Sequence, residues 1–126
     1  MTYNLQQRLV EFSALILAIA ESLTNDRAAN HLRGHLIRAG SAPSLLYAES
    51  QSAESRKDFI HKLKVCLKEA KETLTILEII DKMGYCRNNE MLKRALNENG
   101  QVNAILGASV RTAERNQKEE GKKERK

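Results

Sequence analysis

Residues 52–82 read SAESRKDFIHKLKVCLKEAKETLTILEIIDK, a run of thirty-one positions without a Gly or a Pro. Apolar residues recur in it at spacings of three, four or seven, which is the period of one face of an α-helix. They are Phe59, Leu63, Cys66, Ala70, Leu77 and Ile80. Ser55 stands where it can cap the helix start, and Gly84 suits the C-terminal end. The stretch therefore predicts one long amphipathic helix, a wall of a helical bundle.

Two segments on the N-terminal side carry the same period. Residues 4–23 have apolar positions at spacings of four and three, with Asn4 as a candidate cap. The next segment runs from the break at Thr24–Asp26 to about Glu49. It contains the only proline, Pro43, which lacks an amide donor, so we expect a kink or a short interruption there.

A fourth helix is predicted from Asn88 or Asn89 to about residue 116. Its apolar stripe comprises Leu92, Leu96, Asn99, Val102, Leu106, Val110 and Ala113. Four helices joined by short connections favour an all-α fold, an antiparallel up-down four-helix bundle. The composition agrees, since a chain of 126 residues with no Trp, one Pro and six Gly favours one domain of long helices.

The two cysteines, Cys66 and Cys86, have neither metal-site spacing nor the number that a disulfide framework needs. We therefore expect a reducing, cytoplasmic setting. No signal peptide is expected at the N-terminus. The most apolar run, Phe12–Ala20, is far shorter than the roughly 20 residues that span a bilayer. No membrane association is predicted.

Positive charge is concentrated at the C-terminal end. Residues 111–126 hold seven Lys or Arg against four Glu, a net +3, whereas the other 110 residues carry a net +2. We expect residues 1–116 to form the bundle and residues 117–126 to form a basic, disordered tail. The candidate phosphate-contacting residues of this end are Arg111, Arg115, Lys118, Lys122, Lys123, Arg125 and Lys126.

A second basic group, Lys64, Lys68 and Lys71, alternates with acids on the third helix. Such a pattern is typical of a solvated helix face, but it also fits a surface that attracts phosphates by charge. The chain lacks aromatic platforms for stacking bases, so recognition of a single-stranded sequence is not predicted.

The three histidines provide no convincing reactive centre. His31 and His35 are four residues apart and can share one helix face, but no third metal ligand stands at a supporting spacing. Surface roles, or phosphate contact together with Arg33 and Arg38, remain the alternatives. His61 follows Asp58 by three residues and has no nucleophile to serve. We therefore predict no catalytic residues, no metal, no cofactor and no enzyme activity.

The middle of the chain also resembles a known family. The run from Ser41 to Thr73, with SAP followed by YAESQSAESRKDFIHKLKVCLKEAKET, is similar to small four-helix-bundle proteins. That family is named for open reading frames in intervening sequences of large-subunit rRNA genes. The similarity extends to RLVEFSALILAIAESL (residues 8–23), NHLRGHLIRAGSAPS (residues 30–44) and ILGASVRTAERN (residues 105–116).

The resemblance implies an antiparallel four-helix bundle that assembles as a homopentamer. Related bundles include the accessory protein of diversity-generating retroelements, a basic pentamer that binds nucleic acid and a reverse transcriptase. From the residues themselves, the broad apolar surface of the first helix also predicts self-association. Our leading hypothesis is a non-enzymatic oligomer that binds RNA or DNA by charge. The alternative is a scaffold that docks a partner such as a reverse transcriptase without intrinsic nucleic-acid affinity.

Overall fold

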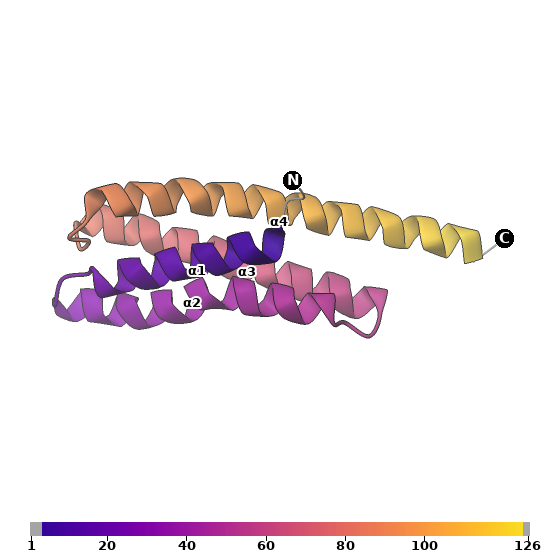
Figure 1. Cartoon of the computed structure of the whole chain (residues 1–126), viewed down its shortest axis with the longest axis horizontal. Coiled ribbons are helices and arrows are strands. Elements are labelled where there is room, and N and C mark those ends of the chain that lie inside the picture. The colour runs from indigo at the N-terminus through magenta and orange to yellow at the C-terminus, as the bar shows by residue number, and fades with distance from the viewer. Residues whose placement is uncertain (1–3, 125–126) are drawn as a thin grey trace.

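The protein, as a computed structural model, is described over residues 4–124, and within that range it is built from four helices. They are α1 (Leu5–Glu21), α2 (Arg27–Gln51), α3 (Arg56–Met83) and α4 (Asn89–Glu124). Figure 1 shows them side by side, with the α1–α2 and α3–α4 loops at one end and the α2–α3 loop at the other. The predicted all-α class with four helices is confirmed.

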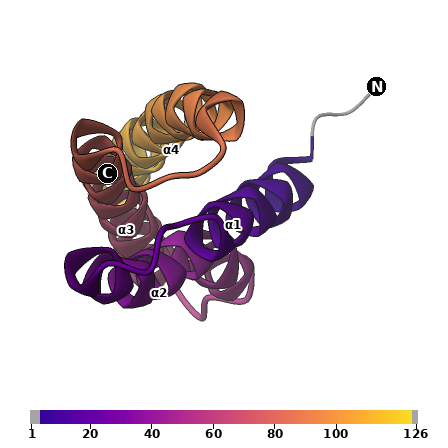
Figure 2. The same ribbon diagram turned by 90° about the vertical axis from the view of Figure 1, so that its left-hand side faces the viewer.

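Each helix packs on its neighbours in the sequence. The end view of Figure 2 shows α1, α2, α3 and α4 in that order around a common centre. α2 contacts both α1 and α3, and α3 also contacts α4, while the contact between α1 and α4 is the smallest. The two helices also differ in length, since α1 has 17 residues and α4 has 36. Much of α4 therefore runs past the end of α1 (Figure 1).

The helix boundaries follow from local capping chemistry. Side-chain oxygens of Asn4, Ser55 and Asn88 each accept a hydrogen bond from a backbone N–H in the first turn that follows. Gly84 ends α3 with a φ of 68°, a conformation that residues with a Cβ avoid. Asp26 stands at the start of α2 but makes no side-chain capping bond. The predicted caps at Asn4, Ser55, Asn88 and Gly84 thus match the structure.

The core lies along the axis of the bundle and is made of the predicted apolar stripes. Its largest fully buried side chains include Leu9, Phe12, Ile16, Leu36, Leu63, Leu77 and Leu106. At the start of α2, Ala29 is buried and Ala28 is exposed. Asn99 is completely buried in the stripe of α4, where its amide donates to the carbonyl of Ala70 at 2.9 Å.

Small residues bring α1 and α2 close together. A Cβ atom added to Gly40 would lie 2.2 Å from Ile16 Cγ2, so the backbone of α2 rests directly against that side chain. The hydroxyls of Ser13 and Ser44 form a buried hydrogen bond of 2.8 Å one turn away. This contact fixes the register of the two helices.

Two predictions about helix continuity are corrected. Of the two alternatives expected at Pro43, the short interruption is absent, since α2 remains helical from Arg27 to Gln51 with the proline buried inside it, and the kink stays a prediction. The expected disordered tail does not begin at residue 117, because α4 continues to Glu124. Residues 117–124 (QKEEGKKE) contain mostly strong helix formers and no proline, and an ion pair between Glu120 and Arg56 of α3 ties this turn to the bundle.

Candidate nucleic-acid interface

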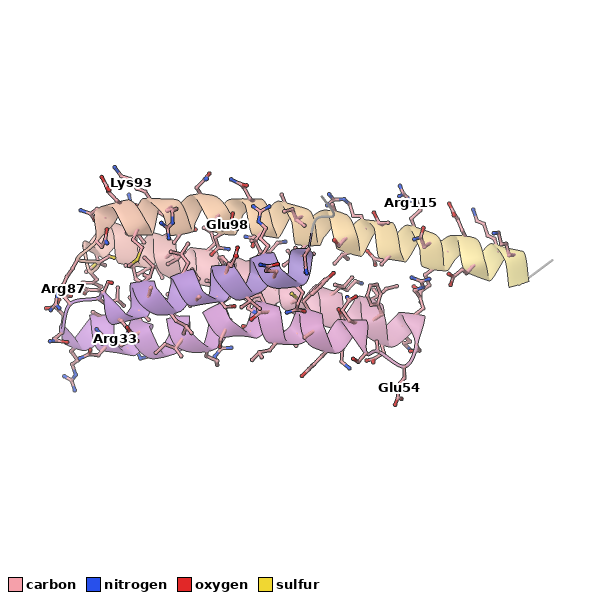
Figure 3. All side chains as sticks on the ribbon, viewed as in Figure 1. Arg33, Glu54, Arg87, Lys93, Glu98 and Arg115 are labelled. Atoms are coloured by element: carbon pink, nitrogen blue, oxygen red, sulfur yellow. The ribbon has the colours of Figure 1, made fainter. Side chains whose placement is uncertain are left out.

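Four of the predicted phosphate-contacting residues share one face of α4. Arg111, Arg115, Lys118 and Lys122 are spaced by four, three and four residues, which places them on one side of a helix. All four are exposed, whereas Val110 and Ala113 of the same turns are buried. In Figure 3, Arg115 points away from the other helices. We call these four residues the cationic stripe; at 1.5 Å per residue it is roughly 16 Å long.

Two acids of the same turns, Glu114 and Glu120, turn toward α3, whereas Glu119 is exposed and lies four residues after Arg115 and three before Lys122. Glu114 pairs with Lys64 at 3.0 Å, and Glu120 pairs with Arg56 at 2.8 Å. Each of these side chains is substantially exposed, so the pairs orient the helices more than they stabilise them. Their effect is to separate charge around α4. Glu114 and Glu120 neutralise cations of α3, and the outward side of α4 keeps four cations with one acid, Glu119, beside them.

The second predicted group lies on the neighbouring helix. Lys64, Lys68 and Lys71 are exposed on α3 and spaced by four and three residues, so they too share a face. The ion pair between Lys64 and Glu114 holds the N-terminal end of this lysine face against the part of α4 that extends beyond α1. The structure therefore places Lys64 beside the turns that carry Arg111 and Arg115. Lys123 is exposed but lies off the cationic stripe, and Arg125 and Lys126 fall outside the described residues.

Arg33 and Arg38, considered above for phosphate contact, are engaged inside the chain. Arg33 donates to three carbonyls at the end of α1 and the following loop, those of Ala20, Leu23 and Thr24, at 2.9–3.0 Å. It caps α1 from the neighbouring helix. The sequence carries no signal for this contact, because the three carbonyls belong to residues 9 to 13 positions earlier.

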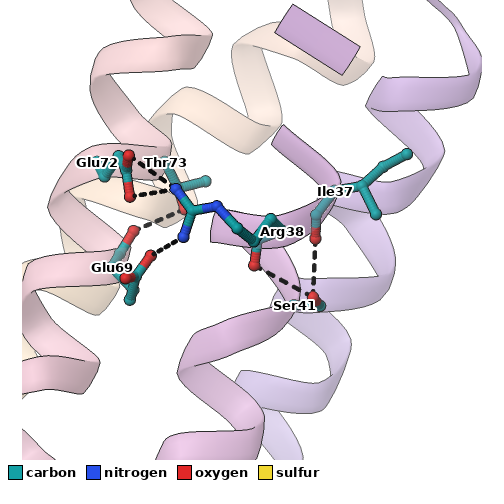
Figure 4. Close-up of polar contacts among 6 residues, drawn as sticks. All are labelled: Ile37, Arg38, Ser41, Glu69, Glu72 and Thr73. Carbon is teal, nitrogen blue, oxygen red and sulfur yellow. Dashed lines mark hydrogen bonds and ion pairs between the residues drawn. The ribbon is translucent and has the colours of Figure 1, made fainter. Parts of the chain in front are cut away.

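Arg38 links α2 to α3, as Figure 4 shows. Its guanidinium donates to both carboxylate oxygens of Glu72, at 2.9 and 3.0 Å, and to Glu69 at 3.2 Å. The hydrogen bond from Arg38 lowers the pKa of Glu72, and the same bond raises the pKa of Arg38. The side chain of Arg38 is exposed, so this is a surface clamp between two helices.

The histidines are not assembled into a reactive site. His31 and His35 are exposed, and their rings meet edge to face with centroids 4.7 Å apart. Asp58 accepts a hydrogen bond from Lys62 at 3.1 Å instead of pairing with His61. Within residues 4–124 the structure has no group of three His, Cys, Asp or Glu side chains that can hold a metal ion. The prediction of no enzyme activity remains a prediction.

The two cysteines are free and buried. Cys66 donates from its thiol to the carbonyl of Pro43 at 3.2 Å, and burial raises its pKa to about 12. A thiol with that pKa is not a nucleophile at neutral pH. Among the described residues, no helix is long and apolar enough to cross a membrane.

An open groove lies where α4 runs past α1. It has a volume of about 520 Å³. Its floor is formed by Phe59 and Leu63 of α3, one wall by Tyr47 of α2, and the other wall by α4 from Ile105 to Asn116. We call it the distal groove. Burial raises the pKa of the Tyr47 phenol in its wall. The sequence did not reveal this groove, because it results from the short length of α1.

Comparison with known proteins identifies the family. Residues 2–108 match the family described as 23S rRNA-intervening sequence protein. The chain belongs to this family. A solved structure from Bacteroides thetaiotaomicron, described as a protein with unknown function from the S23 ribosomal protein family, is 27% identical to the chain. It aligns with a TM-score of 0.77 over 85% of this chain and 98% of that one. No curated protein matches the chain.

The family assignment confirms the resemblance seen in the sequence. The family is described by its link to intervening sequences of 23S rRNA, and this description names no biochemical activity. The matched region ends at residue 108, so the whole cationic stripe lies beyond it. Any task of the stripe must therefore be argued from its own residues.

Proposed function

We propose that this chain is a non-enzymatic accessory protein that binds RNA or DNA through the phosphate backbone. The observation that carries the proposal is the cationic stripe. Arg111, Arg115, Lys118 and Lys122 form one continuous exposed face of α4, and two acids of the same turns, Glu114 and Glu120, are paired with α3. Lysines and arginines in such a row release counterions from a nucleic acid and bind it without reading its bases.

Dimensions and charge support a helical nucleic acid as the ligand. The stripe is roughly 16 Å long, which corresponds to about five base-pair steps of 3.4 Å. The exposed lysines of α3, Lys68 and Lys71, extend the positive surface from the stripe along the bundle. The chain has a net charge of +5 and no Trp, so attraction is electrostatic and stacking plays little part.

The proposed protein works as a homo-oligomer of up-down bundles in the cytoplasm, with the pentamer as the state that the family resemblance implies. Several copies bring several stripes to one ligand. Linked sites raise affinity through effective concentration even when each single site is weak. A modest row of four cations per chain is then sufficient for stable binding.

The test is the salt dependence of binding to a fluorescein-labelled RNA duplex, followed by anisotropy. The variant R111Q/R115Q/K118Q/K122Q removes the stripe. We expect weaker binding and a slope of log K against log salt that is shallower by about 3.6 units per bound chain, about 0.9 for each of the four phosphate contacts removed. A DNA duplex of the same sequence serves as the second arm.

The matched control removes the same number of charges elsewhere. R27Q/K82Q/R87Q/K93Q changes four exposed cations near the opposite end of the bundle. It should leave the slope close to that of the natural sequence. Equal losses in the two variants would show that net charge, and not the stripe, governs binding, and would contradict the proposal.

A scaffold function is the second candidate, and one observation favours it. Val10, Leu17, Ile37, Leu45, Ile79 and Met83 are exposed large apolar side chains. A partner such as a reverse transcriptase can use such surface. If the chain is a scaffold alone, it will show no shift of structured RNA at physiological salt and will still co-purify with a defined partner.

A further inference from the structure

The buried apolar side chains of the bundle form two clusters of very different size. The larger one follows the axis of the bundle and draws on all four helices. The buried members of the smaller one, which we call the distal cluster, come from α3 and α4 and are Ile60, Leu63, Val110 and Ala113. Among the described residues, Tyr47 and Leu67 pack against both clusters, and each is only half-buried. The distal cluster is therefore a small core that is largely separate from the main one.

The boundary between the two clusters falls at Gly107 of α4. Leu106 belongs to the larger cluster and Val110 to the distal one. A glycine weakens the interior of a helix, because it loses more backbone freedom on folding than any other residue. Packing does not require it here, since an added Cβ atom would meet only the end of the flexible Arg111 side chain, at 3.4 Å. α4 thus has a weak point where the two clusters separate.

Two ion pairs hold the part of α4 beyond this point against α3. Glu114 lies 3.0 Å from Lys64, and Glu120 lies 2.8 Å from Arg56. These four side chains are between 41% and 53% exposed, so each pair contributes little to stability and is screened by salt. Closure of this end therefore depends on a small apolar cluster and on two weak pairs.

We propose that residues 107–124 of α4 detach from α3 and unravel as one unit, while the rest of the bundle stays folded. We call these residues the distal segment. Local opening is favoured where few apolar side chains are buried, and up to residue 123 the distal segment buries only Val110 and Ala113. A helix of this length is marginal in water without packing, so the segment loses its helix once it leaves α3. The two ion pairs act as its latch.

Opening changes both surfaces described above. It uncovers Ile60 and Leu63 beside the half-buried Phe59, so the distal groove becomes an open apolar face of α3. It also frees the cationic stripe, because all four of its residues lie on the distal segment. The inference goes beyond the proposed function and does not rest on it, since opening requires no ligand.

Hydrogen exchange of the full natural chain, followed by NMR at single amides, tests the inference. We expect amides 110–116 to exchange roughly tenfold faster, or more, than amides 92–102. Because the segment opens as one unit, its amides should share one opening free energy and one dependence on low urea concentrations. That dependence should be shallower than the one for amides 92–102, since less surface is exposed.

Two glycine variants define the unit. G107A strengthens the helix inside the distal segment, so it should slow exchange of all amides 110–116 by roughly fourfold. G100A is the matched control, because an added Cβ atom there meets nothing within 4 Å and residue 100 stays helical when the segment opens. It should leave amides 110–116 unchanged and slow amides 92–102 by roughly fourfold.

Two glutamate variants test the latch. E114Q removes the partner of Lys64, and we expect it to speed exchange of amides 110–116 by roughly two- to fivefold. Glu119 lies on the same segment and has no ion pair within residues 4–124, so E119Q should change the rates little. In about 1 M salt the difference between E114Q and the natural chain should shrink, since the Debye length there is about 3 Å.

Three results overturn the inference. If G100A slows amides 110–116 as much as amides 92–102, the distal segment opens only with the whole bundle. If protection falls gradually toward the C-terminus and G107A does not alter it, the helix end frays and no unit exists. Equal rates in E114Q and E119Q contradict the latch. None of these results affects nucleic-acid binding, which the stripe variant tests separately.

Discussion

At the scale of single residues, Gly40 determines how closely α1 and α2 approach. Replacing it with Ala adds a methyl group 2.2 Å from Ile16 Cγ2. We expect G40A to lower the free energy of unfolding by about 1–3 kcal/mol, because overpacking outweighs the gain in helix propensity. Urea unfolding followed by circular dichroism measures the change.

Gly34 of the same helix provides the control. A Cβ atom there meets nothing within 4 Å, so G34A should raise the free energy of unfolding by roughly 0.5–1 kcal/mol. I16A should cost less stability in the G40A background than in the natural sequence, because alanine lacks the Cγ2 atom that the added methyl group meets. A G40A protein as stable as G34A would show that the two helices are not in direct contact at this position.

Glu72 provides a prediction about pH. Its pKa in the folded protein is lowered from 4.5 by the hydrogen bond from Arg38. A lowered folded pKa means that the contact stabilises the fold above pH 4.5 and that this contribution is lost as the pH falls through the folded pKa. An NMR titration of the Glu72 carboxyl should show this lowered pKa, and R38M should move it back toward the ordinary value. Identical titrations in both proteins would exclude the clamp.

Asn99 illustrates what the sequence can and cannot show at this scale. Its place in the stripe of α4 predicted burial, and it is completely buried. The pattern did not show that its amide donates to the carbonyl of Ala70 while its Oδ1 has no partner within the described residues. Such contacts depend on the register between α3 and α4, which is set by residues far apart in the chain.

At the scale of helices, Arg33 shows how one element stabilises the end of another. It donates to the carbonyl of Ala20 in the last turn of α1 and to the carbonyls of Leu23 and Thr24 in the loop that follows. The last carbonyls of a helix have no hydrogen-bond partner within the helix itself. We expect R33M to lower the free energy of unfolding by roughly 1.5–3 kcal/mol, the usual value for hydrogen bonds from a charged group. R27M alters an exposed arginine of the same helix and should change it little. Equal effects would refute the capping role.

Helix existence and type were predictable from the sequence because they depend on local spacing and caps. Ser55, Gly84 and Asn88 marked boundaries that the structure has. Helix ends without such signals were not predictable. Composition indicated disorder after residue 116, since no apolar side chain anchors those residues. The structure continues the helix because no residue stops it and because Glu120 meets Arg56 of α3.

At the scale of the whole molecule, the unequal lengths of α1 and α4 create both candidate surfaces. The distal half of α4 carries the groove on one side and the cationic stripe on another. The sequence predicted the four residues of the stripe as candidate phosphate contacts but placed two of them, Lys118 and Lys122, in a disordered tail. The four cations of the stripe share one face because α4 continues through all of them without a break. The groove was missed because no single segment contains it.

The residues of α4 that pack in the core precede most of those that carry its exposed positive charge, and this order allows a final prediction. Among the residues of α4 whose burial is described, up to residue 123, Ala113 is the last buried one, so a chain ending at Asn116 keeps the described core and loses Lys118 and Lys122. Thermal unfolding should change little, since none of the described side chains from 117 to 123 is buried and the ion pair that is lost, Arg56–Glu120, is an exposed one. The salt dependence of RNA binding should nevertheless fall by roughly two units of slope, for the two lost phosphate contacts. A large drop in melting temperature with an unchanged slope would mean that the distal helix serves the fold and not the ligand.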